Sequence, residues 1–175
     1  MAKRGAAPVA SAAGAGDRRD ELGQLLALMD EAFDRKAWHG TTLRGSLRGV
    51  TAAQAARRPG PGRHNIWEVA VHAAYWKYAV RRRLTGEKRG RFPLEGSNWF
   101  VRPAPGGADE AAWRRDMVLL GDEHARLREV VAALDPARLH RYTRGSAHRV
   151  DFTLRGIAAH DLYHAGQIQL LKRLT

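Results

Sequence analysis

The sequence contains no cysteine among its 175 residues. A chain without cysteine forms no disulfide, offers no thiolate to a metal and has no cysteine nucleophile, and such chains are typical of a reducing compartment. We therefore expect a cytoplasmic protein. Any thiol chemistry here would need a thiol supplied by a cosubstrate.

Long apolar runs are also missing, since no stretch of the sequence approaches the length that spans a bilayer, and no membrane partner is predicted. Residues 1–16 are rich in alanine and glycine and include Lys3 and Arg4, but they lack the apolar core of a secretory signal. We expect 1–16 to be a disordered leader. Residues 17–175 are expected to form a single domain, for which a hydrophobic content of 44% is sufficient.

Alternating β patterns do not rise above noise, whereas apolar residues recur at helical spacing. The sequence predicts helices over 20–48, with a break near Gly40, and over 65–85, 109–134 and 153–174. Asn65 is a suitable N-cap for the second of these helices, with Glu68 three residues later in a capping-box arrangement. The expected fold class is therefore all-α, as a four-helix bundle.

The connection between the second and third predicted helices spans 24 residues, from Thr85 to Ala108, and is rich in glycine and proline. It is too long for a simple turn and long enough to return along a bundle. We therefore expect the second and third helices to be parallel neighbours joined by a long crossover. The part carrying Ser97, Asn98, Trp99, Phe100 and Arg102 could close over a site or merely cover the bundle.

The formal net charge is +12, which makes nucleic acid a partner to consider. However, 25 of the 30 basic residues are arginines spread along most of the chain, and neither zinc-finger spacing nor a ribonucleoprotein aromatic motif is present. The cluster 81–83 with Lys88, Arg89 and Arg91 could form an anion-binding patch or a solvated helix end. No specific nucleic-acid partner is predicted.

Three histidines form the strongest candidate site. His160 and His164 stand four residues apart in the last predicted helix, so both rings project from one face, and His72 lies on the inward stripe of the second helix. A single buried histidine is more often satisfied by a carbonyl or a carboxylate. Three on two inward stripes favour a divalent-metal site with open coordination positions.

The segment 65–76, which contains His72, and the motif His160-Asp161-Leu162-Tyr163-His164-Ala165-Gly166-Gln167-Ile168 resemble the DinB-like superfamily of bacterial metal-binding four-helix bundles. The resemblance covers about residues 20–175. It implies that His72, His160 and His164 hold a divalent metal, whose identity varies in the family: zinc, nickel, iron or manganese. Some relatives are thiol-dependent S-transferases or isomerases, so the resemblance implies a site more firmly than a reaction.

Three neutral imidazoles would leave the metal its full charge, so a water or a thiol cosubstrate could be activated against a small-molecule substrate. The leading interpretation is a hydrolase or S-transferase. The alternative is a noncatalytic metal- or ligand-binding bundle, with a homodimer as a possible assembly. A zinc metalloprotease is disfavoured because it requires glutamate directly after the first histidine, where Asp161 stands.

Other residues are weaker candidates for catalysis. His39 would point into the bundle if 38–50 were helical, and Glu68 lies one turn before His72 and could hydrogen-bond its free ring nitrogen. His124 lies on the inward stripe of the third helix, but in parallel helices it would sit about two turns away from His72. It is therefore interpreted as a core or interhelical histidine. His64, His140 and His148 show no detectable chemistry.

Overall fold

The computed structural model describes residues 12–103, 109–143 and 145–174. The chain is all-α, as expected, and these residues contain no β-strand beyond an isolated bridge between Tyr142 and Arg149. The helices are α1 (Ala12–Phe33), α2 (Leu43–Ser46), α3 (Ala52–Ala56), α4 (Ile66–Thr85), α5 (Glu110–Ala132), the 3₁₀ helix η1 (Pro136–Arg138) and α6 (Val150–Leu174). None of the helices in this part of the chain is long and apolar enough to cross a bilayer.

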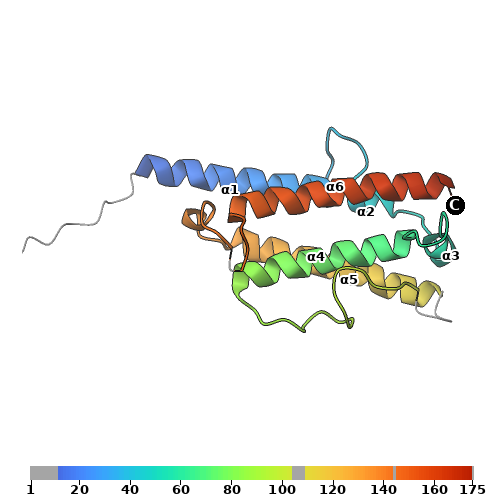
Figure 1. The fold of residues 1–175 in the computed structure, drawn as a ribbon. Helices are drawn as coiled ribbons and strands as arrows, with labels where there is room; N and C mark the ends of the chain where they lie inside the picture. Colours follow the sequence, from blue (N-terminus) through green and yellow to red (C-terminus); the bar gives the residue numbers. More distant parts are fainter. Residues whose placement is uncertain (1–11, 104–108, 144, 175) are drawn as a thin grey trace, which may run out of the picture.

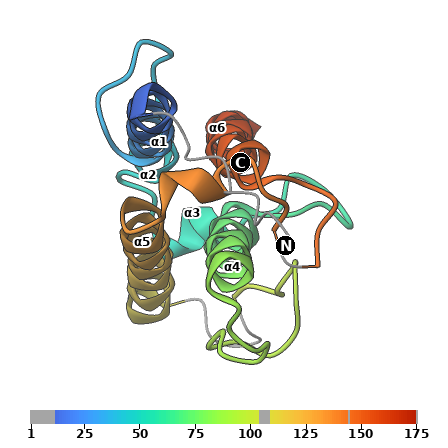
Figure 2. The ribbon, with the colours of Figure 1, turned by 90° about the vertical axis from the view of Figure 1, so that its left-hand side faces the viewer.

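The four long helices lie side by side. Seen along their axes, α1 and α6 form one layer and α5 and α4 form the other (Figure 2), and contacts join α1 to α6, α6 to α4, α4 to α5 and α5 to α1. The colours of Figure 1 show that α4 and α5 run in the same direction and that α1 and α6 run in the opposite one. This arrangement brings the inward faces of α4 and α6 together.

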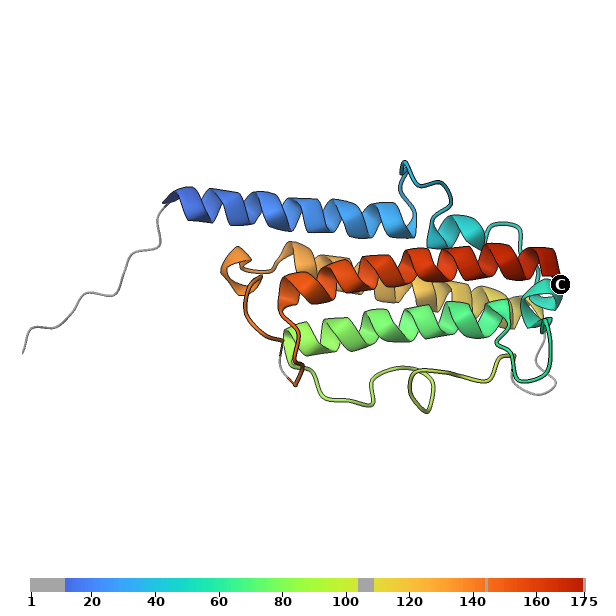
Figure 3. The same cartoon turned by 45° about the horizontal axis from the view of Figure 1, so that its top comes forward.

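The segment that follows α4 runs back along that helix before α5 begins (Figure 3). Gly86 ends α4 in the left-handed conformation, with φ of 79°, and its N–H donates to the carbonyl of Arg82. At the other end of α4, the side chain of Asn65 accepts from the N–H of Glu68 at 2.8 Å, as an N-cap does. Asp109 caps α5 in the same way through the N–H of Ala112.

The largest corrections to the expected element boundaries lie near the N-terminus; elsewhere, the short helix α3 was not expected and α6 begins at Val150 instead of 153. The helix α1 begins at Ala12, so residues 12–16 of the expected disordered leader are helical, and 1–11 lie outside the described residues. The first helical region ends at Phe33, and residues 36–42 form an irregular loop before α2. The expected break near Gly40 is therefore a loop that separates α1 from α2, and Gly40 adopts a left-handed φ of 98° within it.

The interior consists of two apolar clusters with polar residues between them. In α6, Leu154, Ile157 and Ala158 belong to one cluster, and Ile168 belongs to the other. His160, Asp161 and His164 fall between these positions, and the last two are buried. A buried polar group without a partner destabilises a fold, so each of these three side chains is expected to have a partner. Their contacts therefore indicate the function of this polar layer.

Candidate metal centre

The structure brings His72, His160 and His164 together between α4 and α6. Nε2 of His160 lies 3.1 Å from Nε2 of His72 and 3.0 Å from Nε2 of His164. The candidate ligand nitrogens of the three rings lie within 4.8 Å of one another, and no carboxylate or further imidazole of the described residues joins this group. The three histidines that the sequence singled out are thus one cluster.

In two of these rings, the partner of Nδ1 fixes which ring nitrogen carries the hydrogen. Nδ1 of His72 lies 2.8 Å from the carbonyl oxygen of Asn98, and Nδ1 of His164 lies 2.7 Å from Oε1 of Gln167. Both partners are acceptors, so each Nδ1 carries a hydrogen and each neutral ring presents a bare lone pair at Nε2. The Nδ1 of His160 is buried and has no hydrogen-bond partner in the described part of the chain.

Two lone pairs therefore face Nε2 of His160, which holds at most one hydrogen and can donate it to only one of them. The cluster lacks the protons that would satisfy it by hydrogen bonding alone. Two nitrogens that each lie about 2.1 Å from one metal ion are about 3.0 to 3.4 Å apart at common coordination angles, which agrees with the two Nε2 separations. The donor set thus fits a divalent cation.

Burial keeps all three rings neutral. It lowers the pKa of His72 to about 4, against a smaller opposing effect of the Asn98 carbonyl, and it lowers the pKa of His160 to about 3, helped by the neighbouring His164. Burial also lowers the pKa of His164. A neutral imidazole is the form that binds a metal, so no proton has to leave the cluster at neutral pH.

The segment after α4 reaches the cluster through Asn98. This residue adopts φ of 65°, in the left-handed region that asparagine tolerates better than most residues. In this conformation its carbonyl faces His72, and its side-chain Oδ1 accepts from Nε1 of Trp76 at 3.0 Å. The segment that follows α4 therefore contacts the histidine cluster directly.

Trp99 lies between two imidazoles. Its ring stacks on His72, with centroids 3.8 Å apart, and on His64, with centroids 3.7 Å apart. No chemistry was predicted for His64 because it lies in a polar loop without a periodic pattern. Trp99 itself was the available signal, since an aromatic residue in a long connecting segment is suited to covering a site.

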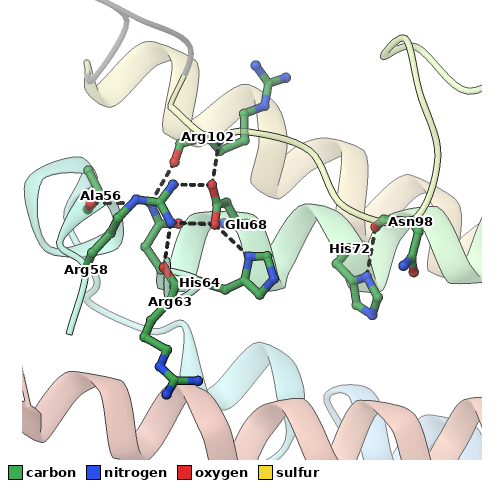
Figure 4. A network of polar contacts seen from close by, with 9 residues as sticks. Ala56, Arg58, Arg63, His64, Glu68, His72, Asn98 and Arg102 are labelled. Atoms are coloured by element: carbon green, nitrogen blue, oxygen red, sulfur yellow. Dashed lines mark hydrogen bonds and ion pairs between the residues drawn. The ribbon is translucent and has the colours of Figure 1, made fainter. Parts of the chain in front are cut away.

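Glu68 does not contact His72, which corrects one of its expected roles. Its buried carboxylate binds the Arg58 guanidinium and Nδ1 of His64, at 2.9 Å for the latter, and accepts from the N–H of Arg102 (Figure 4). Burial raises the pKa of Glu68, but these hydrogen bonds outweigh burial and hold that pKa below its usual value. Glu68 thus ties α4 to the loops on both sides and supports the His64–Trp99 stack.

A buried ion pair adjoins the histidine cluster. Nζ of Lys77 lies 2.5 Å from Oδ2 of Asp161, and each side chain is only 1% exposed. Burial raises the pKa of Asp161, against the attraction of Lys77. Asp161 follows His160 directly but its carboxylate is engaged by Lys77, so it is absent from the ligand group.

The other two histidines considered do not join the cluster. His124 is buried and stacks on Phe33, with ring centroids 3.7 Å apart, so it is an interhelical histidine between α5 and α1 as expected. His39 is exposed in the loop before α2, and it borders a hollow beside α6 that Leu162 and Gln169 also line. The condition under which His39 would point into the bundle is not met, because 38–42 is not helical.

Comparison with known families gives a match to the model of the DinB superfamily over residues 35–168. This range is more than half of the chain and contains all three clustered histidines, together with Trp99 and Asn98. No curated protein and no solved structure matches the chain significantly.

Proposed function

The chain belongs to the DinB superfamily, and we propose that it is a divalent-metal protein whose ion is held by His72, His160 and His164. The fold that contains this site is, in our proposal, a single four-helix bundle domain in which the connection between α4 and α5 is the long crossover. The main support for this proposal is the convergence of three neutral imidazoles. Their Nε2 atoms carry too few hydrogens for all of them to be hydrogen-bonded to one another.

We further propose that the site is catalytic, as a hydrolase or a thiol S-transferase acting on a small-molecule substrate. A divalent ion held by three uncharged ligands keeps its full charge when bound, so it acidifies a water or a thiol cosubstrate and polarises a carbonyl oxygen. The ligand group contains three side chains in the described residues, which is the number typical of catalytic sites.

The surrounding residues would orient the ligands and limit the access of water. Asn98 and Gln167 hold the Nδ1 hydrogens of His72 and His164, which fixes both rings with Nε2 turned inward. Trp99 covers the face of His72. His160 is the least enclosed of the three, and it lines a cavity between α4 and α6, which is a route for a substrate.

The test is turnover by protein loaded separately with zinc, nickel, iron(II) and manganese, on panels of esters and of electrophiles offered with small thiols. We expect one metal to support turnover that His160→Ala abolishes and that the exposed-loop control His39→Ala retains. Activity that survives His160→Ala, or no turnover with any of these metals, would count against catalysis at this site.

The noncatalytic alternative, a metal- or ligand-binding bundle, is favoured by the burial of the cluster, since His72 and His164 are 5% and 3% exposed. An ion enclosed by a fourth protein ligand, seen in a crystal structure of the metal-loaded protein, would establish it over the enzyme. The homodimer, the cytoplasmic location and the lack of a specific nucleic-acid partner stay predictions.

A further inference from the structure

A cavity of about 160 Å³ lies between α4 and α6 beside the histidine cluster. Trp76, Val80 and Arg83 contribute from α4, and Phe152, Ile157 and His160 are among its residues from α6. We name it the α4–α6 groove. It shares His160 with the proposed metal site, so a molecule bound there would lie against one of the three ligands.

The walls of the α4–α6 groove are mainly apolar. Trp76 and Phe152 face it from opposite helices, Val80 and Ile157 add aliphatic surface, and Phe152 is 56% exposed. An apolar cavity of roughly 150 Å³ is known to take up a benzene molecule. The size and lining of this groove therefore suit a ligand with one compact apolar group of about six heavy atoms.

Cationic and polar groups border the same groove. The Arg83 guanidinium lies 5.7 Å from the ring centroid of Trp76, and no ion pair links it to a carboxylate of the described residues. His148, on the α6 side, packs against Phe152 with ring centroids 4.8 Å apart. Neither side of the groove carries an acidic lining residue, so its charge favours an anion, and the planar guanidinium matches a carboxylate.

We propose that the α4–α6 groove binds a small carboxylate that bears a benzene-sized apolar group, with the apolar part between Trp76 and Phe152 and the carboxylate at Arg83. This inference rests on the proposed function in one respect, since it makes this carboxylate the class of substrate presented to the metal site. The binding itself depends only on the groove.

Gly156 allows a direct test. It lies in the lining within α6, and a Cβ added there meets nothing within 4 Å, so the first atom of a leucine side chain has free space there, and Gly156→Leu adds apolar bulk at the groove lining. Gly23→Leu is the matched control, because Gly23 is also helical, also has free space at its Cβ and lies in α1. Both substitutions replace glycine in a helix by a better helix former.

The measurement is the Kd of phenylacetate and of neutral phenylacetamide, by isothermal titration calorimetry on the zinc-loaded full chain, with the zinc content determined in each sample. We expect Gly156→Leu to weaken phenylacetate about 10-fold or more and Gly23→Leu to leave it unchanged. Arg83→Met should weaken phenylacetate about 10-fold while leaving phenylacetamide unaffected, since a charged hydrogen bond is lost only for the anion.

Equal phenylacetate binding in the native chain and in Gly156→Leu would overturn the proposal, as would no binding by a native chain that carries its zinc. The reverse result, phenylacetate binding with the expected variant pattern in a chain that takes up no zinc, would leave the groove standing and reject the metal function. The two failures are therefore distinguishable.

Discussion

The indole of Trp99 stacks on the imidazole of His72, with ring centroids 3.8 Å apart and planes inclined by 13°. The same indole stacks on His64 with its other face, and the preceding residue, Asn98, accepts from Nδ1 of His72. Two consecutive residues of the segment after α4 therefore contact both the ring face and Nδ1 of His72, a proposed metal ligand.

Replacing Trp99 with alanine should weaken metal binding without removing a ligand. His72 would lose the stacked ring that fixes its orientation, and losing a group that orients a ligand costs about 10-fold or more in metal affinity. The measurement is zinc affinity by competition with a chromophoric chelator. Trp38→Ala is the matched control, because Trp38 is fully exposed; equal affinities in the two variants would contradict the role given to Trp99.

Breaking the Lys77–Asp161 pair should destabilise the fold. Lys77→Met leaves the Asp161 carboxylate buried without its cation, which costs about 3 to 5 kcal/mol, whereas the double variant Lys77→Met/Asp161→Leu removes both charges and should regain most of that loss. Chemical denaturation of the metal-free protein measures both. If the double variant loses as much stability as Lys77→Met and Asp161→Leu lose together as single variants, the charges act independently.

The buried His124 should make stability depend on pH. Burial, with a further contribution from the charge of Lys77, lowers the pKa of His124 from 6.5 to about 3. Between these pH values the side chain is protonated in the unfolded chain and neutral in the folded chain. The contribution to stability is complete above pH 6.5 and is lost as the pH falls toward 3, at up to about 1.4 kcal/mol per pH unit.

The corresponding experiment compares the unfolding free energy of the native chain and of His124→Gln from pH 7 to pH 4. The variant should lose stability less steeply than the native chain, because its side chain takes up no proton in either state. His39→Gln, which alters an exposed histidine, should keep the native slope. Parallel curves for the native chain and His124→Gln would rule out this source of acid sensitivity.

The sequence alone predicted the features that follow from periodicity and capping. The helix from Asn65 to Thr85 agrees with α4 within a residue, and the inward stripes placed His72, His160 and His164 on facing sides of α4 and α6. The separation of His124 from His72 also followed from helical rise once the two helices were taken as parallel.

The residues around the cluster could not be predicted in the same way. Trp99, Asn98 and His64 lie in segments without a repeating pattern, and their positions depend on a left-handed backbone at Asn98 and on long-range contacts. The Glu68 carboxylate binds Arg58, which lies ten residues earlier, although its spacing also suited His72. The helix on which an inward His39 depended does not form, because the helical segment after Trp38 begins only at Leu43.

The most direct test of the central claim is the metal content of the purified chain, measured by inductively coupled plasma mass spectrometry after loading with zinc and removal of free metal. About one ion per chain is expected for the native protein, and most of it should be lost in each of His72→Ala, His160→Ala and His164→Ala, with helix content retained in all three because the apolar clusters hold the helices together. A native chain that binds no ion, or three variants that keep it, would contradict the account.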